Sequence, residues 1–436
     1  MKTVCVMGLD RFHLDLLNTI PDASEHYQFL TLYEKDEIVH PPELAYPPLQ
    51  TMVDHALDLF ARSPQPVDGI MGYWDLPTSV AVPLIAHIAG LPGAPLEAVA
   101  RCEHKYWSRI EQTTVLPEMV GRFQAIDPFA DDPLAQVQLP YPFWLKPVKA
   151  HSSFLGFYIE DAAALQRHLP TIRENIGIMA RPMNEFLDRI HLPEDVAKVD
   201  AWHCIAEEII SEGLQCTLEG YGWKDDVEIF GVVDSIRGGQ RNSSFTRYQY
   251  PSSLPEPVQR RMRDATVKLM RHIGYRGAAF NVEFYWNPET DRIRLLEINA
   301  RISKSHSPLF LMVDGCTNQK VSMDLALGQR PDPPHRLGTF PLAAKFMVRY
   351  FEDAILERVP TETDILAVRA LFPEALVRPM AAQGTRLSDI DLQDSYSFEV
   401  AEIFLGGRTE TELVDKYDTA LDRLGFKIRP LDRVTE

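Results

Sequence analysis

Apolar residues along this 436-residue chain follow two spacings, one typical of strands and one typical of helices. Continuous apolar or β-branched runs predict strands at Thr3–Leu9, Asp68–Tyr73, Tyr141–Leu145, Cys204–Ile210 and Glu228–Ser235. Apolar positions at helical spacing predict helices at Thr78–Ala89, Pro255–Ile273 and Thr409–Leu424, and a short helix follows Asp10. Strands and helices therefore mix along the whole chain, which is typical of an α/β protein.

Two of the predicted helices carry end signals. Pro255–Ile273 has Ser253 nearby as a candidate cap and Gly274 as a stop signal. Its apolar stripe consists of Val258, Met262, Ala265, Leu269 and Ile273. In the second helix Thr409 and Glu412 predict a capping box. Both helices have the pattern of core packing rather than of chemistry.

Proline-containing breaks divide the chain into three predicted domains. Leu91-Pro92-Gly93 places one boundary near residue 95, and three prolines after residue 330 mark another. Residues 1–95 predict a small, parallel, Rossmann-like domain, although no G-x-G-x-x-G motif supports a dinucleotide site there. Residues 96–330 form the predicted central domain, and residues 331–436 a C-terminal α+β region.

The segment Phe280–Ser307 predicts a strand hairpin that carries two opposed acidic residues. Phe280–Trp286 and Arg292–Asn299 are strand-like and are separated by turn residues. A register centred on residue 290 sets Glu283 directly opposite Glu297, with Cβ atoms roughly 5 Å apart. Two carboxylates at that distance repel each other unless a cation lies between them. Mg²⁺ shared between carboxylates and nucleotide phosphates fits such a pair.

The alternative is that both glutamates are solvated beside basic neighbours. The series Glu297-x-Asn299-x-Arg301 favours the metal interpretation, because it adds an amide oxygen and a guanidinium at alternate strand positions. On this interpretation one face of the second strand carries Ile293, Leu295, Glu297, Asn299 and Arg301.

This hairpin resembles the metal-binding hairpin of ATP-grasp enzymes, especially the carbamoyl-phosphate synthetase and biotin carboxylase branch. The resemblance implies an ATP-grasp α+β fold with a pre-ATP-grasp N-terminal domain. It implies ATP and Mg²⁺ as cofactors, with Mn²⁺ as an alternative ion. Glu283, Glu297 and Asn299 become the metal ligands, and Arg301 the group that binds an acyl phosphate or substrate anion. Asn281 stands where some branches place an arginine, which favours this branch over the D-alanine ligases.

The resemblance also assigns residues to the phosphates of ATP. Lys146 resembles the second ATP lysine of the family and Lys105 the first, and both would neutralise phosphate charge. Residues 149–156 resemble the mobile glycine-rich loop of the family, but they contain one glycine where relatives have two or three. Side chains would supply the missing donors: His151, Ser152 and Ser153.

Cys204–Ile210 resembles the adenine hinge of the family, whose backbone groups pair with the adenine edge. Glu207, Glu208 and Ile210 take the hinge positions, and the alternative is a strand with two solvated acids. Gln215 stands, allowing for one extra residue, where the family holds the ribose hydroxyls with a glutamate. A neutral amide there implies weaker binding of the ribose.

Further residues are candidates for the substrate side. The N-terminal domain of the family contributes to the acceptor site, which makes Asp75 and Thr78 candidates, although both residue types are ordinary helix caps. Lys304 and His306 follow the hairpin and are candidates for substrate contact, with a structural histidine as the alternative. The polar segment Arg237–Asn242 either lines the acceptor pocket or is an exposed loop.

Composition and charge narrow the partners and the compartment. The formal net charge of −18, without a basic stripe, argues against a nucleic-acid surface. Five widely spaced cysteines without a C-x-x-C pair argue against a disulfide framework or a zinc site and indicate buried thiols in a reducing compartment. No signal peptide or membrane-spanning apolar run stands out, so a cytoplasmic location is expected.

These assignments predict an ATP-dependent carboxylate–amine ligase. The resemblance implies that a carboxylate attacks the γ-phosphate of MgATP, and that an amine then displaces phosphate from the acyl phosphate. The catalytic residues would be Lys146, Asn299 and Arg301, and the favoured substrates are amino acids or small peptide-like acids and amines. A bicarbonate-activating carboxylase and a non-catalytic ATP-binding protein stay open as alternatives. A homodimer is one option for the assembly.

Overall fold

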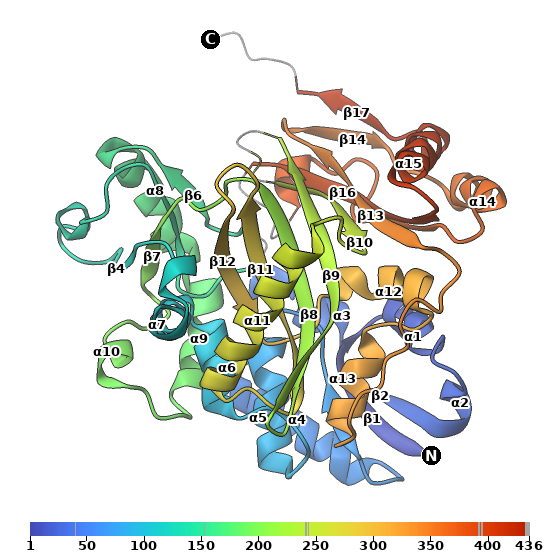
Figure 1. The fold of residues 1–436 in the computed structure, drawn as a ribbon, viewed down its shortest axis with the longest axis horizontal. Coiled ribbons are helices and arrows are strands. Elements are labelled where there is room, and N and C mark those ends of the chain that lie inside the picture. Colours follow the sequence, from blue (N-terminus) through green and yellow to red (C-terminus); the bar gives the residue numbers. More distant parts are fainter. Residues whose placement is uncertain are drawn as a thin grey trace. The chain divides into compact units, whose positions relative to one another are not determined.

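The structure is a computed structural model that describes residues 1–39, 41–151, 153–239, 242, 244–390, 393 and 396–431. The chain separates into two compact units. The first comprises residues 1–231, 254–304 and 318–333, and the second comprises residues 232–253, 305–317 and 334–436. Both contain strands and helices (Figure 1). The predicted boundaries near residues 95 and 330 stay predictions.

The first unit starts with a three-stranded parallel sheet in the order β2-β1-β3. β1 (Lys2–Leu9) is buried after its first residue, as its apolar sequence predicts, and pairs with β2 (Tyr27–Glu34) and β3 (Gly69–Met71). The helices of this part are α1 (Arg11–Leu17), α2 (Ala23–His26), α3 (Lys35–Ile38), α4 (Leu49–Arg62) and α5 (Thr78–Ala89). The predicted helix at Thr78–Ala89 is confirmed, and it follows β3 directly.

A second sheet of the first unit is antiparallel and has the order β4-β7-β5-β6. Its strands are β4 (Phe123–Ile126), β5 (Phe143–Pro147), β6 (Phe157–Ile159) and β7 (Cys204–Glu208). One face packs on an apolar core that includes Leu165, Leu169 and Ile172 of α8 (Ala162–Asn175). The neighbouring helices are α6 (Leu96–Glu103), α7 (Lys105–Val115), α9 (Gly177–Leu187) and α10 (Glu194–Ala197).

A third group of strands carries the predicted hairpin. β12 (Arg292–Asn299), β11 (Ala278–Asn287) and β8 (Leu214–Trp223) lie side by side in antiparallel order, and β9 (Asp226–Gly238) follows β8 and continues into the second unit. The amphipathic helix α11 (Glu256–Ile273) lies against β11 (Figure 1). The residues of its predicted stripe are buried. The helix α13 (Gln319–Ala326) contacts both β3 and β11.

In the second unit the later part of β9 is the first strand of an antiparallel series, in which the strand order is β9-β10-β13-β16-β15. These strands are β10 (Ser244–Tyr250), β13 (Leu342–Tyr350), β15 (Leu376–Pro379) and β16 (Phe398–Gly407), and β14 (Ala354–Arg358) pairs separately with β17 (Lys427–Pro430). Its helices are α12 (Ser307–Asp314), α14 (Glu362–Leu371) and α15 (Glu410–Leu424). The second unit thus combines strands and helices, and the prediction of a separate C-terminal α+β region at residues 331–436 stays a prediction.

The predicted helix ends are confirmed in part. Gly274 ends α11 in the left-handed conformation, with φ of 75°. Ser253 does not cap α11, because its hydroxyl donates to Asp234 over 2.7 Å, so that prediction is wrong. At α15 the Thr409 hydroxyl accepts from the Glu412 backbone N–H, which confirms half of the capping box. The Glu412 carboxylate accepts from the Arg408 N–H instead of closing the box.

Two composition-based expectations can be compared with the fold. All five cysteines fall in the described part of the chain, where they are buried and form no disulfide. Within the described residues no helix combines the length and apolarity needed to span a bilayer.

The polar segment Arg237–Asn242, a candidate for the acceptor pocket, is described only in part, because Gln240 and Arg241 lie outside the described residues.

Candidate functional site

The predicted hairpin carries its two glutamates in the predicted register. Strands β11 and β12 pair with Glu283 opposite Glu297 and with Asn281 opposite Asn299. Asn281 and Asn299 are buried, whereas both glutamates are partly accessible. Two carboxylates and one amide oxygen therefore lie on one patch of the sheet, which is the donor set that a hard divalent cation prefers.

A β-bulge interrupts β12 next to this pair. The register shifts between Glu283 and Phe284, so that Phe284 pairs with Leu295 and Leu296 is the extra residue. Directly paired residues point to the same side of a sheet, so Leu295 and Ile293 face away from Glu297. The prediction that Ile293 and Leu295 share the face of Glu297 is therefore wrong. It assumed unbroken alternation along β12.

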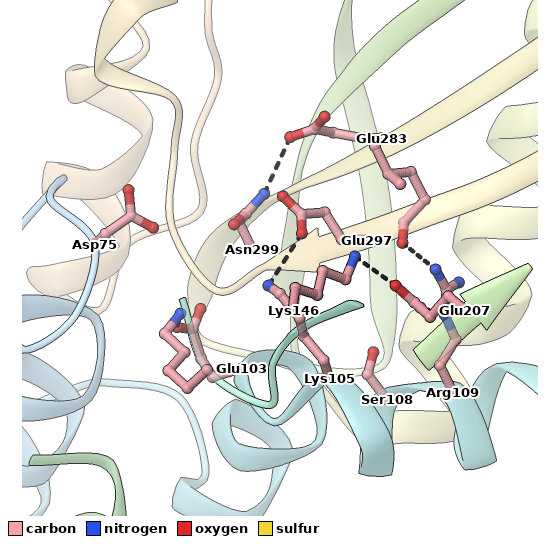
Figure 2. Close-up of polar contacts among 12 residues, drawn as sticks. Asp75, Glu103, Lys105, Ser108, Arg109, Lys146, Glu207, Glu283, Glu297 and Asn299 are labelled. Carbon is pink, nitrogen blue, oxygen red and sulfur yellow. Dashed lines mark hydrogen bonds and ion pairs between the residues drawn. The ribbon is translucent and has the colours of Figure 1, made fainter. Parts of the chain in front are cut away.

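Carboxamide side chains hold Glu283. The Asn299 Nδ2 atom lies 3.4 Å from Glu283 Oε1 and 2.9 Å from Asn281 Oδ1. The Gln215 Nε2 atom donates to Glu283 Oε2 over 2.7 Å. Figure 2 shows Asn299 directed at Glu283. Gln215 thus lies beside a candidate metal ligand, and its role on a ribose stays a prediction.

Both predicted phosphate lysines lie at the same site. Lys105 is the first residue of α7, and its Nζ is 3.1 Å from Glu297 Oε2. Lys146 lies in β5, and its Nζ is 2.6 Å from Glu207 Oε2 (Figure 2). Each lysine therefore forms an ion pair with a carboxylate of the site. The partner of Lys105 is the predicted metal ligand Glu297, and the partner of Lys146 is the predicted hinge residue Glu207.

Arg109 is a site residue that sequence reasoning missed. Its Nε donates to Glu207 Oε1 over 2.6 Å, so Glu207 is held by Arg109 and Lys146 together (Figure 2). Its two Nη atoms donate to the carbonyl oxygens of Leu295 and Leu296, over 2.8 and 2.6 Å. The Arg109 side chain is 5% exposed. One buried guanidinium thus satisfies the carbonyls of the bulge and connects the hairpin to β7.

Glu103 is a second residue that the sequence did not reveal. Its carboxylate accepts from the Lys149 ammonium, from the Ser79 hydroxyl over 2.9 Å, and from the Ala300 N–H over 2.9 Å. Glu103 and Lys149 are both buried. This ion pair therefore connects three segments: the start of the predicted phosphate loop, α5, and the backbone between Asn299 and Arg301.

The predicted phosphate loop has unusual backbone geometry. Ser153 and Leu155 both adopt the left-handed conformation, with φ of 58° and 54°. Non-glycine residues rarely adopt it, so two such residues together indicate a strained loop. The Gly156 N–H donates to the Ser153 carbonyl over 3.0 Å. Ser153 is exposed and His151 half-buried, and Ser152 lies outside the described residues.

Arg301 forms an ion pair with Asp75. The Arg301 Nη2 lies 2.8 Å from both carboxylate oxygens of Asp75, and Nη1 donates to the Ile302 carbonyl. Burial opposes ionisation of Asp75, but the Arg301 charge outweighs it and holds the pKa of this carboxyl well below its usual range. Burial and then the Asp75 charge raise the pKa of Tyr46 to about 12. Two residues predicted for the substrate side therefore contact each other.

The other predicted residues are more dispersed. Glu208 ends β7 and accepts from the Arg122 N–H over 2.9 Å, and Ile210 lies just beyond that strand. The Lys304 ammonium lies 4.7 Å from the centre of the Trp74 ring. His306 is buried in the second unit with its ring against Tyr248. The roles predicted for Glu208, Ile210, Lys304 and His306 stay predictions.

The electrostatics of the site favour ionised carboxylates. For Glu297 burial opposes ionisation, but the charges of Lys105 and Lys146 outweigh it and lower the pKa to about 2. For Glu207 burial is likewise outweighed by Arg109 and Lys146, and the pKa is lowered to about 2. Burial tends to lower the pKa of Lys105, yet the Glu297 charge raises it overall. The site therefore consists of ionised pairs at neutral pH.

These lowered pKa values predict acid instability that depends on Glu207. A carboxyl whose pKa falls from 4.5 to about 2 on folding stabilises the fold above pH 4.5. The stabilisation is lost as the pH falls from 4.5 towards 2. We expect Glu207→Gln to make the decline of the free energy of unfolding across this range shallower, measured by urea denaturation at several pH values. Glu208→Gln, on the neighbouring half-exposed residue, is the matched control, and equal slopes for Glu207→Gln and wild type would contradict the prediction.

No group of three or more His, Cys, Asp and Glu side chains in the described part of the chain could hold a metal ion. The candidate metal set depends for this reason on the amide of Asn299 in addition to Glu283 and Glu297. These three donors fit Mg²⁺, which accepts a small number of protein oxygens and completes its shell with phosphate oxygens and water. The assignment of the three residues stays a prediction.

Comparison with known proteins adds the family context. Residues 249–332 match the family model described as carbamoyl-phosphate synthase L chain, ATP binding domain. The carbamoyl phosphate synthase large chain of Acidobacterium capsulatum is 36% identical over 146 residues, which cover 29% of this chain and 13% of that protein. The matched part therefore spans far less than two thirds of such curated relatives.

Solved structures are similar over almost the whole chain. The L-amino acid ligase from Bacillus licheniformis superposes with a TM-score of 0.69 and 14% identity over 99% of both chains. The biotin carboxylase domain of the Hydrogenobacter thermophilus 2-oxoglutarate carboxylase, in complex with MgADP and bicarbonate, gives a TM-score of 0.63 and 16% identity. That match covers 98% of this chain and 91% of the other. These likenesses confirm the fold class predicted from the hairpin.

Proposed function

We propose that this chain, which belongs to the ATP-grasp superfamily, is an ATP-dependent carboxylate–amine ligase that works through an acyl phosphate. The observation that carries the proposal is the pair Glu283–Glu297 in direct register, with Asn299 beside it and Lys105 in contact with Glu297. Amino acids or small peptide-like acids and amines are the proposed substrates, and ADP and phosphate are the proposed products.

The proposed binding of MgATP exchanges ion pairs instead of creating unpaired charges. Phosphate oxygens would replace Glu297 on Lys105 and Glu207 on Lys146, and Glu207 would keep Arg109 as its partner. Glu283, Glu297 and Asn299 would hold the magnesium, which supplies Lewis-acid stabilisation of phosphoryl charge when bound. Because every buried charge keeps a partner of opposite sign, this exchange avoids most of the cost of an isolated buried ion.

The transfer step then needs positioning and charge neutralisation more than covalent help from the protein. Lys105 and Lys146 would neutralise negative charge on the phosphoryl oxygens while the substrate carboxylate attacks. Arg301 would hold the substrate anion, and its bond to Asp75 fixes the plane of the guanidinium. The amine would then attack the acyl carbon and form the C–N bond, the C–O bond to phosphate would break with its electron pair going to phosphate, and the departing phosphate would take up the proton that the nitrogen loses.

The direct test is a screen for substrate-dependent product release. We expect release of ADP and phosphate to require Mg²⁺ and a pair of amino acids, and mass spectrometry to detect the condensed product. Release that depends on bicarbonate alone would instead indicate the carboxylase alternative. Tight ATP binding without release under any of these conditions would indicate a non-catalytic ATP-binding protein. Either of these results would overturn the proposal.

A further inference from the structure

The backbone that follows the predicted hairpin is held by buried side chains. β12 ends at Asn299, so the next backbone groups lie beyond the strand ladder and need other partners. The Ala300 N–H donates to Glu103 Oε1 over 2.9 Å. The Arg301 carbonyl accepts from Asn281 Nδ2, also over 2.9 Å. Glu103 and Asn281 are each 2% exposed, so these side chains fix the direction in which the chain leaves the predicted metal ligand Asn299.

The two oxygens of the Glu103 carboxylate serve different parts of the first unit. Oε1 accepts from the Ala300 N–H, whereas Oε2 accepts from the Lys149 ammonium and from the Ser79 hydroxyl. The side chains of Glu103 and Lys149 are 1% and 3% exposed, so water does not compete for this ion pair. Because both oxygens belong to one planar group, a change of partner at Oε2 also moves the acceptor of the Ala300 N–H.

The Lys149 end of this ion pair is anchored beside the predicted phosphate lysine Lys105. The preceding residue, Val148, donates its N–H to the His203 carbonyl over 2.9 Å. The Val148 carbonyl accepts from the Lys105 N–H over 3.0 Å. Lys149 is also the first residue of the predicted phosphate loop. One buried ion pair therefore joins the residue next to Asn299 with the start of that loop and with the backbone of Lys105.

Stability alone does not require an ion pair at this place, because apolar residues of similar volume often stabilise a fold as well as a buried pair does. We propose that Glu103 is a positioning residue for the predicted magnesium site. Through the Ala300 N–H it orients Asn299, and through Lys149 it fixes the start of the phosphate loop relative to that ligand. The inference rests on the proposed function, to which it adds a residue that acts only through others.

The central test replaces both members of the pair. In Glu103→Met/Lys149→Met two apolar side chains of similar length take their places, so no buried charge is left alone and we expect the full chain to fold. Calorimetry then measures binding of the β,γ-imido analogue of ATP with and without Mg²⁺. Without Mg²⁺ the affinity should stay near the wild-type value, since Lys105 and Lys146 are unchanged. The increase in affinity that Mg²⁺ adds should fall by about tenfold, because Asn299 is no longer held in place.

Two single variants make the test specific. Lys149→Arg keeps a cation at Glu103 and should keep most of the increase that Mg²⁺ adds, whereas Lys149→Met should lose it. This comparison also serves if the double variant does not fold. Lys416→Met is the matched control, since it removes the cation of another largely buried pair, Lys416–Glu374 at 2.8 Å in the second unit. It should bind the analogue as wild type does under both conditions.

Two results would overturn the inference. One is a folded double variant in which Mg²⁺ adds as much affinity as in wild type, because the ion pair would then be structural only. The other is an equal loss of affinity with and without Mg²⁺, which indicates general damage to the nucleotide site. If the double variant does not fold, equal increases in Lys149→Arg and Lys149→Met would have the same consequence.

Failure of the proposed function gives a different result. A wild type that binds the analogue with Mg²⁺ but releases no phosphate with any amino-acid pair refutes the ligase activity. A selective loss of the Mg²⁺-dependent increase in the double variant would still support the role of Glu103. Conversely, phosphate release by the wild type, together with an unchanged increase in the double variant, would support the ligase and refute the role of Glu103.

Discussion

Glu297→Gln is expected to lower ATP-dependent phosphate release by about a hundred- to a thousandfold. The substitution removes an ionised oxygen from a residue that has two roles in the proposed mechanism, as a magnesium ligand and as the partner of Lys105. It is opposite Glu283 in the hairpin, and its Oε2 is the partner of Lys105 at 3.1 Å. A glutamine keeps the shape but supplies one neutral oxygen, which binds Mg²⁺ more weakly and no longer orients Lys105.

The measurement is a steady-state phosphate-release assay over a range of Mg²⁺ concentrations. We expect the variant to stay folded by circular dichroism and excess Mg²⁺ to restore little activity. Glu289→Gln makes the same chemical change in the exposed turn of the same hairpin, and it should match wild type. Removal of the metal by EDTA should abolish release by the wild type. Activity of Glu297→Gln within a few-fold of wild type would contradict the metal assignment.

The local pattern of the sequence was enough to predict the hairpin and a few of the helices, among them α5, α11 and α15. The register of Glu283 and Glu297 follows from the positions of two strands and the turn between them, which are all close in sequence. Helix α11 follows from its stripe and from Gly274. These features depend on residues within one or two turns or on one hairpin, and there periodicity is a strong signal.

Contacts between distant segments could not be predicted in this way. Arg109 on a helix and Leu295 on a strand are 186 residues apart, and Glu103 and Ala300 are 197 apart. Neither Arg109 nor Glu103 belongs to a motif, and both lie on helices where a charged residue is usually solvated. For Glu103 a signal was nonetheless present, because it follows Val99, Ala100 and Cys102 on a helix face that proved to be buried. Arg109 gave no such signal, because the residues beside it are Ser108, which is polar, and Ile110, which is only half-buried. Strong burial of a charge requires a partner, but the sequence alone does not name that partner.

The bulge at Leu296 shows how a local error and a long-range contact are connected. A bulge leaves backbone carbonyls without ladder partners, and buried carbonyls need donors. Arg109 supplies them for both Leu295 and Leu296. The same bulge turns the apolar residues of β12 to one face and keeps Glu297 on the other. The bulge in β12, which breaks the simple alternation, and the buried Arg109, which donates to its carbonyls, therefore belong to one structural feature.

The largest loss of stability is expected for Arg109→Met, at about 3–5 kcal/mol in the free energy of unfolding. The substitution keeps the approximate volume of the side chain but removes all its donors. Two carbonyls of the bulge lose their partners, and Glu207 keeps Lys146 alone at 2.6 Å. Because Glu207 is buried, water cannot replace Arg109, which is one of its two cationic partners. Urea denaturation monitored by tryptophan fluorescence provides the measurement.

Arg294→Met is the matched control for this effect. Arg294 lies on β12, next to Leu295 of the bulge, and like Arg109 it donates to two backbone carbonyls, those of Glu118 and Val120, but it is only half-buried. Its loss should cost about 1 kcal/mol or less, because water can take over its contacts. Arg109→Lys should fall between the two, since it restores the charge beside Glu207 but cannot reach that carboxylate and both carbonyls together. If Arg109→Met proved no less stable than Arg294→Met, the Arg109 guanidinium would not be what holds the bulge.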